Sequence, residues 1–260
     1  KPCVINASYG DYLGSHDGLD AMSLYLDSLL HEKDGRLFVA AAGNSGDWGP
    51  YHLRHESSGV ADTNFTWFMP NGSSSAGSTV WLDIWGDTAN MNDLQFSFGA
   101  DHNSTFAHAD HLTFRNILAD GMVGTTIVDS LMNGGKMTEV EIYTEIRGGQ
   151  YNMQIYLPVI DSVDYNYSLI TSGTGMLDLW TISYLGLFIG PDIVWLSDMV
   201  DTGLPAGGTW PDISHYQIPD SAQSIVTGFQ CLESVVTVGQ YVNRADYTDY
   251  LSAVQVSPQL

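Results

Sequence analysis

An asparagine stands where a buried segment of the chain reaches a polar turn. Residues 37–42, LFVAAA, form a continuous apolar run of the kind expected for a strand covered on both faces, and Asn44 follows in the turn Gly-Asn-Ser-Gly. An amide at the carboxyl end of a parallel strand can donate a hydrogen bond into a cleft and stabilise negative charge there. The same four residues are also ordinary turn chemistry, so that Asn44 could simply close a turn.

The elements that must position Asn44 begin at the first residues. VINAS, residues 4–8, predicts a short buried strand that ends at Tyr9-Gly10. Between residues 19 and 30 apolar side chains recur at helical spacing, with Ser15 or Asp17 as candidate caps and Asp34-Gly35 as the stop. Strand, helix and strand in this order predict a parallel pair joined by a right-handed crossover.

The pattern changes after about residue 52, where short strands with period-two alternation follow one another. Turn-rich pieces separate them, and helical periodicity is almost absent. This pattern predicts an antiparallel β-sandwich inserted at about 52–228. A further apolar strand at 233–242 returns to the style of the beginning, so the expected fold class is an α/β fragment interrupted by the sandwich and strand-dominated overall. The predicted inserted strands are 64–69, 79–85, 94–99, 124–129, 137–146, 151–159, 166–173 and 176–182.

Composition limits the partners. The chain of 260 residues has 30 acidic residues against 8 Lys plus Arg, a formal net charge of -22. Such a field repels phosphate backbones and anionic lipids, so we expect no nucleic acid as a partner and an extracytoplasmic setting, secreted or in the cell envelope. No apolar run is long enough to span a bilayer, so we expect no membrane insertion. Cys3 and Cys231 make no disulfide scaffold and no zinc spacing, although one long-range bridge between them is conceivable.

Four blocks then point to a family. VINASYG, an amphipathic helix, LFVAAAGNSG and VVTVGQY occur in the order in which they occur in subtilisin-like serine proteases, and the chain resembles the central segment of that family. The resemblance implies a partial subtilase α/β core at 1–51 and 229–260 and a jelly-roll-like insertion at 52–228. It implies that Asn44 is the oxyanion-hole side chain. It also implies substrate-binding residues, namely a strand that pairs with the peptide (Ser8, Tyr9, Gly10) and a pocket wall (Ala41, Ala42, Gly43).

The departures from the family are as informative. The chain contains no H-G-T and no G-T-S, and its one D-T-G, Asp201 to Gly203, lies on the wrong side of the Asn44 block. Without the Asp, His and Ser of the triad, this chain alone is expected to be inactive. Both ends look cut from something larger, so we expect a piece of a secreted endopeptidase whose partner is a peptide or protein substrate. The alternative is a non-catalytic module of a pseudoprotease that binds protein or glycan.

Other residue clusters could bind a ligand or could have a purely structural role. The stretch 101–111, DHNSTFAHADH, could hold a metal through Asp101, His102, His108, Asp110 and His111, but a polar loop explains it as well. No cofactor is expected and no metal ligands are assigned, although acidic pairs such as Asp83/Asp87 and Asp161/Asp164 leave calcium open. His52 and His55 could line a cleft or a domain junction. Aromatic side chains on the predicted strands could form a glycan platform, or core and cross-strand pairs: Trp67, Trp81, Trp85, Tyr143, Tyr151, Tyr156 and Trp180.

Overall fold

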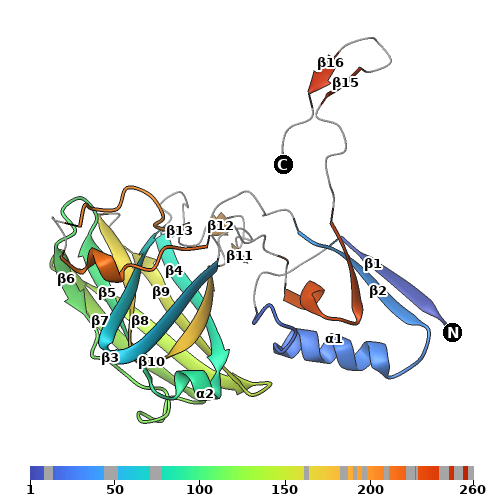
Figure 1. Cartoon of the computed structure of the whole chain (residues 1–260), viewed down its shortest axis with the longest axis horizontal. Helices are drawn as coiled ribbons and strands as arrows, with labels where there is room; N and C mark the ends of the chain where they lie inside the picture. Colours follow the sequence, from blue (N-terminus) through green and yellow to red (C-terminus); the bar gives the residue numbers. More distant parts are fainter. Residues whose placement is uncertain are drawn as a thin grey trace.

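The structure is a computed structural model with two groups of strands, an antiparallel body on the left of Figure 1 and a small parallel group on the right. It describes residues 1–8, 14–43, 52–70, 78–160, 164–181, 187–189, 192–194, 198–207, 211–220, 226, 228–239, 246–248 and 254–256.

Nine strands form the antiparallel sheet. Seven of them lie side by side in the order β13-β3-β10-β4-β9-β8-β7, while β5 pairs with β10 and β6 pairs with β5. The strands are β3 (His52–Met69), β4 (Ser78–Asp87), β5 (Leu94–His102), β6 (His108–His111), β7 (Thr125–Asn133), β8 (Lys136–Arg147), β9 (Gln150–Ile160), β10 (Tyr165–Thr181) and β13 (Asp198–Met199).

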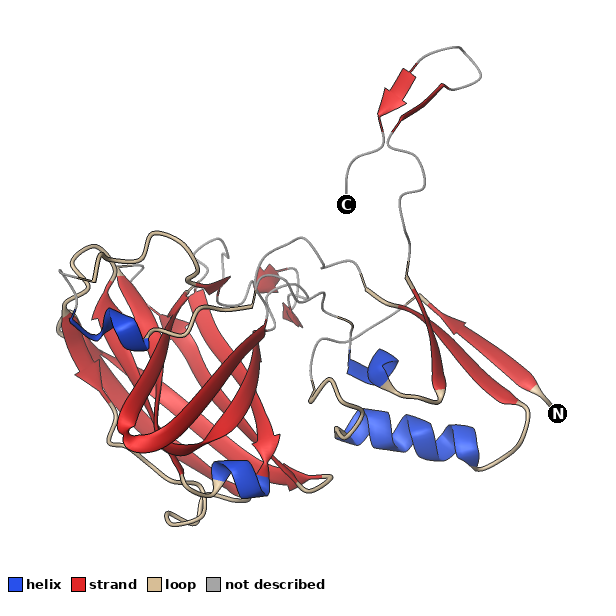
Figure 2. Ribbon diagram, viewed as in Figure 1, coloured by secondary structure: helices blue, strands red, loops and turns tan. Residues whose placement is uncertain are grey.

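The sheet curls until it nearly closes, as Figure 2 shows for the strand-rich body. β10 is the branch point: residues 165–173 pair with β5 and residues 178–181 with β4, while β3 runs along its other side. The ends of the sheet meet where the Met132 amide of β7 donates to Asp110 Oδ2 of β6 at 2.9 Å. The short helix α2 (Thr88–Met91) follows β4.

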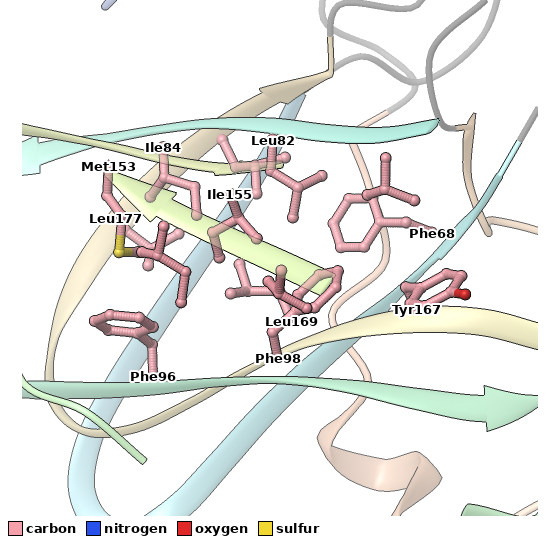
Figure 3. Packing of buried hydrophobic residues seen from close by; sticks show 14 of the residues in the cluster. Phe68, Leu82, Ile84, Phe96, Phe98, Met153, Ile155, Tyr167, Leu169 and Leu177 are labelled. Atoms are coloured by element: carbon pink, nitrogen blue, oxygen red, sulfur yellow. The ribbon is translucent and has the colours of Figure 1, made fainter. Parts of the chain in front are cut away.

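The alternation of buried and exposed side chains along the strands explains why the antiparallel body encloses a core. Successive side chains point to opposite faces of a sheet, and every second residue is buried from Thr138 to Thr144 of β8 and from Met153 to Leu157 of β9. Figure 3 shows the resulting core, in which Phe96 and Phe98 of β5 face Leu82, Ile84, Met153 and Ile155 across the enclosed space. The largest fully buried side chains of the chain include Trp67, Tyr167, Phe68, Phe98, Leu53, Leu82 and Ile84.

The first half of β3 escaped the sequence prediction, which began this strand at residue 64. Its inward positions include His55 and Ser57, which are polar but buried. His55 is held between the hydroxyl groups of Thr171 and Thr66, at 2.9 and 3.0 Å. Burial lowers the pKa of His55 to about 3, so its imidazole is neutral at physiological pH.

The parallel group contains three strands and one long helix. β1 (Cys3–Ala7), β2 (Arg36–Ala41) and β14 (Val235–Val238) lie in the order β1-β2-β14, with parallel pairing throughout. α1 (Ala21–His31) connects β1 to β2. Leu26 and Leu30 of α1 pack with Phe38 of β2 against a small core of Ala40, Phe229 and Val235.

The start of α1 differs from the sequence prediction. Asp20, and neither Ser15 nor Asp17, is the N-cap, because its carboxylate accepts the Ser23 amide at 2.9 Å. The helix ends at His31, before the predicted stop, and Gly35 adopts φ of 84° in the turn to β2. Asp17 instead accepts the amide of Leu19 at 2.9 Å in the segment that precedes the helix.

The predicted fold class, an α/β fragment interrupted by a β-sandwich, is wrong. The described chain is dominated by one nearly closed antiparallel sheet, and its parallel strands amount to three short segments with a single helix between two of them. The antiparallel strand-rich region itself was predicted correctly. The error concerns how the strands assemble: β10 belongs to both sides of the curled body, so the strands form one continuous sheet where two separate sheets were expected.

Smaller elements complete the described structure. Two hairpins join β11 (Leu187–Ile189) to β12 (Asp192–Val194) and β15 (Asp246–Thr248) to β16 (Val254–Val256). Two 3₁₀ helices, η1 (Pro211–His215) and η2 (Gly228–Cys231), precede β14. None of the helices among the described residues has the length and apolar character needed to cross a membrane.

Candidate functional sites

The carboxyl ends of the parallel strands bring several predicted substrate-binding residues together. In the parallel register Ala7 of β1 pairs with Ala40 of β2, so that Ser8 and Ala41 leave the two strands at the same edge. Ala41 pairs in turn with Val238 of β14, whose carbonyl accepts the Ala42 amide at 3.0 Å. In open sheets with parallel strands, ligands bind outside the carboxyl ends of the strands.

The exposure of these residues suits contact with a ligand. Ser8 and Gly43 are exposed, whereas Ala41 and Ala42 are half-buried. Gly43 has φ of 111°, a conformation that L side chains rarely adopt and that favours glycine at this position. The Ala41 carbonyl accepts the side-chain amide of Gln230 at 3.1 Å, which fixes the end of the strand.

Three predicted site residues lie outside the described residues: Tyr9, Gly10 and Asn44. The oxyanion role of Asn44 and the peptide-pairing role of Tyr9 and Gly10 therefore stay predictions. The described residues that directly precede them, Ser8 and Gly43, lie at the carboxyl ends of β1 and β2.

A second candidate site lies where the segment before α1 meets the antiparallel body. The Gly14 amide donates to the buried carboxylate of Asp83 in β4 at 3.0 Å, and the Gln150 side chain of β9 donates to Asp17 at 2.6 Å. Asn152 donates to the other oxygen of Asp83 at 2.6 Å. Burial raises the pKa of Asp83, and the hydrogen bonds from Gly14 and Asn152 oppose that rise.

A cavity of about 430 Å³ opens beside these contacts. Residues 15–17 line it together with residues of β3, β4 and β10. Its lining combines aromatic rings with charged and polar groups: Ser15, His16, Asp17, His52, Arg54, Trp85, Gly86, Asp87, Asn90, Gln150, Met176, Asp178, Trp180, Val226 and Cys231.

A histidine and a carboxylate form the electrostatic centre of this cavity. His52 Nε2 lies 2.8 Å from Asp178 Oδ1, and Arg54 donates to both oxygens of Asp178, at 2.9 and 3.0 Å. Burial alone would raise the pKa of Asp178, but the hydrogen bonds from His52 and Arg54 and the charge of Arg54 outweigh it, so that this pKa lies below its ordinary value. Asp178 is therefore ionised at neutral pH.

Two histidines flank one tryptophan in the lining of this cavity. The ring of His16 stacks on Trp180 with centroids 4.7 Å apart, and His52 lies 5.1 Å from Trp180 at a tilt of 40°. His16 Nδ1 lies 2.8 Å from the Val226 carbonyl. Sequence reasoning placed His52 at a cleft or junction, as the structure does, but gave no signal for Asp178, which lies 126 residues away in the chain.

Two groups in the cavity lining could in principle act as nucleophiles, the Cys231 thiol and the Ser15 hydroxyl. A nucleophile needs an adjacent base or a lowered pKa, yet burial raises the pKa of the Cys231 thiol, and Asp17 and Asp20 raise it further. The hydroxyl of Ser15 is hydrogen-bonded to the Asp17 carboxylate. The raised pKa leaves the Cys231 thiol protonated and not activated as a nucleophile.

The residues weighed as metal ligands have other partners in the structure. Asp101 accepts from Trp67 Nε1 and pairs with His108, both at 2.8 Å, and Asp110 accepts the Met132 amide. His111 Nδ1 lies 2.8 Å from the Leu112 carbonyl. Within the described ranges no group of three or more His, Cys, Asp or Glu side chains could hold a metal ion. Of the acidic positions weighed for calcium, Asp161 lies outside the described residues.

The cysteines are not bridged. Cys3 is exposed on β1 and Cys231 is half-buried at the end of η2, and both are free thiols. The conceivable long-range disulfide between them is therefore absent from the structure.

Comparisons with known proteins identify no family for the chain and a weak structural similarity. No protein-family model matches the sequence, and no curated protein matches it. One similar solved structure is that of the CspB protease of Clostridium perfringens, with 17% sequence identity and a TM-score of 0.47; the match covers 69% of this chain and 35% of the other. The chain thus spans about a third of that protein. Because a TM-score below 0.5 does not establish a shared fold, this similarity assigns neither a fold nor an activity to the chain.

Proposed function

We propose that this chain is part of a secreted or envelope-associated subtilisin-like serine endopeptidase and contributes its peptide-binding edge. Ser8, Tyr9 and Gly10 pair with the backbone of the substrate, and Ala41, Ala42 and Gly43 form a wall of the pocket beside the scissile bond. Asn44 donates its amide to the oxyanion. The chain holds no triad and so does not hydrolyse peptides by itself.

One observation carries this proposal. The parallel register of β1, β2 and β14 brings Ser8, Ala41 and Ala42 to a single edge, although Ser8 and Ala41 are 33 positions apart in the sequence. Small side chains at 41–43 leave room for a substrate side chain, and Ser8 is exposed just beyond the last paired residue of β1. The acidic net charge favours substrates with basic residues.

The test is turnover by the complete product of the gene. With a fluorogenic peptide substrate, the intact protein should hydrolyse peptide and the isolated 260-residue chain should not. An Asn44→Ala variant of the intact protein should lose about 10²–10³ in kcat with little change in KM, because the amide acts on charge that develops only in the transition state. A Lys33→Ala variant, at an exposed residue between α1 and β2, serves as the control. Unchanged kcat in Asn44→Ala would refute the oxyanion role.

A second candidate function is a non-catalytic binding module. The absence of H-G-T and G-T-S from all 260 residues favours it. If the intact protein hydrolyses no peptide, yet the 260-residue chain still binds an extended peptide at Ser8 and Ala41–Gly43, the second function replaces the first.

A further inference from the structure

A groove on the outer face of the antiparallel body has no role in peptide binding. It lies over β4, β9, β8 and β7, which run side by side in the sheet of Figure 1. Its volume is about 200 Å³, and six residues line it: Trp81, Thr126, Glu141, Tyr143, Gln154 and Tyr156.

The strand register explains why these six side chains share one face. Trp81, Tyr156 and Glu141 form one row across three strands, and Gln154, Tyr143 and Thr126 form the next row. Their sequence neighbours point the other way, into the core: Leu82, Ile142 and Ile155 are fully buried. The six are half-buried or, for Thr126, exposed, so that a ligand can reach them.

Aromatic rings give the groove its shape. Trp81 and Tyr156 meet nearly edge to face, with centroids 5.8 Å apart and an angle of 66° between the planes. Tyr143 adds a third ring from β8, and its hydroxyl donates to Glu145 at 3.2 Å. Glu145 is held in turn by Arg147 at 2.7 Å, so the third ring is fixed from outside the groove. The rings thus form a corner with apolar faces at a set angle.

Polar groups without partners surround this corner. Among the described residues no hydrogen bond or ion pair engages the side chains of Glu141, Gln154 or Thr126, and the buried Trp81 Nε1 donates to no acceptor. Burial raises the pKa of the Tyr156 hydroxyl, and the charge of Glu141 raises it further, so Tyr156 remains a neutral donor. The groove therefore offers a carboxylate acceptor, an amide that both donates and accepts, and the neutral hydroxyl groups of Tyr156 and Thr126.

This combination selects a chemical class of ligand. A pyranose ring presents apolar C–H faces that pack on aromatic rings, and vicinal hydroxyl groups that donate to carboxylate and amide oxygens. Glu141 and the net charge of -22 disfavour uronic, sialylated or phosphorylated sugars. We infer that this groove, defined by Trp81, Tyr156 and Glu141, is a binding site for a neutral pyranose unit of a glycan.

The test is calorimetric titration of the full chain with defined sugars. The probes are cellohexaose, maltohexaose, mannohexaose and chitohexaose, the corresponding monosaccharides, oligogalacturonate as an anionic control, and a Lys-rich peptide. At least one neutral hexasaccharide should bind with Kd of about 1 mM or tighter, and oligogalacturonate should not. Stronger binding of the hexasaccharide than of its monosaccharide identifies a polymer as the source of the ligand. Equal affinities identify a free sugar.

Two variants locate the binding. Trp81→Ala removes a wall of the corner, and Glu141→Gln keeps the shape but removes the charge; each should weaken binding about tenfold or more. Tyr25→Ala, at an exposed ring of α1 outside the groove, should leave the affinity unchanged. Thermal unfolding checks that each variant is folded. If Trp81→Ala does not fold, the affinity of Glu141→Gln alone tests whether sugar binds in this groove. The inference fails if no neutral sugar binds at about 10 mM. It also fails if binding survives Glu141→Gln unaltered, or if only the Lys-rich peptide binds.

Discussion

The Nε2 atom of His52 lies 2.8 Å from Oδ1 of Asp178, across two paired strands and beside the segment that leads into α1. Arg54, two residues after His52, holds the same carboxylate at 2.9 Å and keeps it charged inside a partly enclosed cavity. This carboxylate fastens β3 to β10 at the point where the antiparallel body meets the rest of the chain.

The Asp178 carboxylate should make stability depend on acid. Its folded pKa lies below the ordinary 3.8, so its contribution is complete above that pH and disappears as the pH falls through the folded pKa. Asp178→Asn should therefore reduce the free energy of unfolding by about 1–3 kcal/mol at pH 7, and this difference should shrink below pH 3.8. Urea unfolding at several pH values measures both quantities.

A matched surface substitution calibrates that result. Glu32 is exposed and pairs with Arg36 at 2.8 Å, and Glu32→Gln should change stability by no more than about 0.5 kcal/mol. If the difference between Asp178→Asn and the unaltered chain stays constant from pH 7 to pH 2, the assignment of the lowered pKa to Asp178 is wrong.

Asp83 should protect the backbone amide of Gly14 from hydrogen exchange. Its carboxylate is the acceptor for Gly14 N–H, so Asp83→Ala should accelerate hydrogen exchange at Gly14 and cost about 1–3 kcal/mol of stability. Asp87→Ala is the control, because Asp87 lies on the same strand and its side chain makes no cap hydrogen bond. Equal exchange at Gly14 in the two variants would show that the Asp83 contact is not formed in solution.

A glycine allows β10 to run on as one long strand. Gly173 has φ of 99°, and a Cβ there would fall against the carbonyl oxygen of Asp93. Gly173→Ala should therefore destabilise the fold by more than about 2 kcal/mol. Gly59 is its partner in the register but has open space around it, so Gly59→Ala should have little effect. Similar denaturation midpoints for the two variants would contradict the strain at Gly173.

The outer face of the parallel strands should bind apolar probes. Val236 and Val238 of β14 are 47% and 54% exposed, and Val4 and Leu37 are exposed on the neighbouring strands. We expect the isolated chain to associate or to bind the neutral dye Nile red, and Val236→Thr with Val238→Thr to reduce either effect. A monodisperse chain that leaves the dye dark would mean that this face is covered in solution.

Local patterns predicted most of the strands because alternation is a local property. The two glycines at 173 and 175 looked like a turn and split β10 into two predicted strands, but positive φ at both lets pairing continue through a bulge. The first half of β3 was missed because His55 and Ser57 occupy inward positions that usually hold apolar residues. The fold class was wrong because no local window reveals how strands join into one sheet.

The candidate sites also differ in how far the sequence could predict them. Ser8 and Ala41 lie at the same edge because β1 and β2 are parallel, and the order strand, helix, strand in the sequence already predicts a parallel pair. The pair His52–Asp178 and the row Trp81–Tyr156–Glu141 depend on contacts between distant strands, and residue types alone cannot supply those contacts. Trp81, Tyr143 and Tyr156 were recognised in the sequence only as members of a larger aromatic set.

The most direct test of the proposed function is a nuclear magnetic resonance titration of the ¹⁵N-labelled 260-residue chain with an extended peptide that carries a basic residue. Backbone amide shifts should concentrate at Ser8 and at Ala41 to Gly43, the edge formed by β1 and β2. The same peptide should leave Thr126 and Glu141, in the outer groove, unmoved. Saturable shifts at the edge are the predicted result. A titration in which those amides stay fixed while others move would contradict the claim that this chain presents a peptide-binding edge.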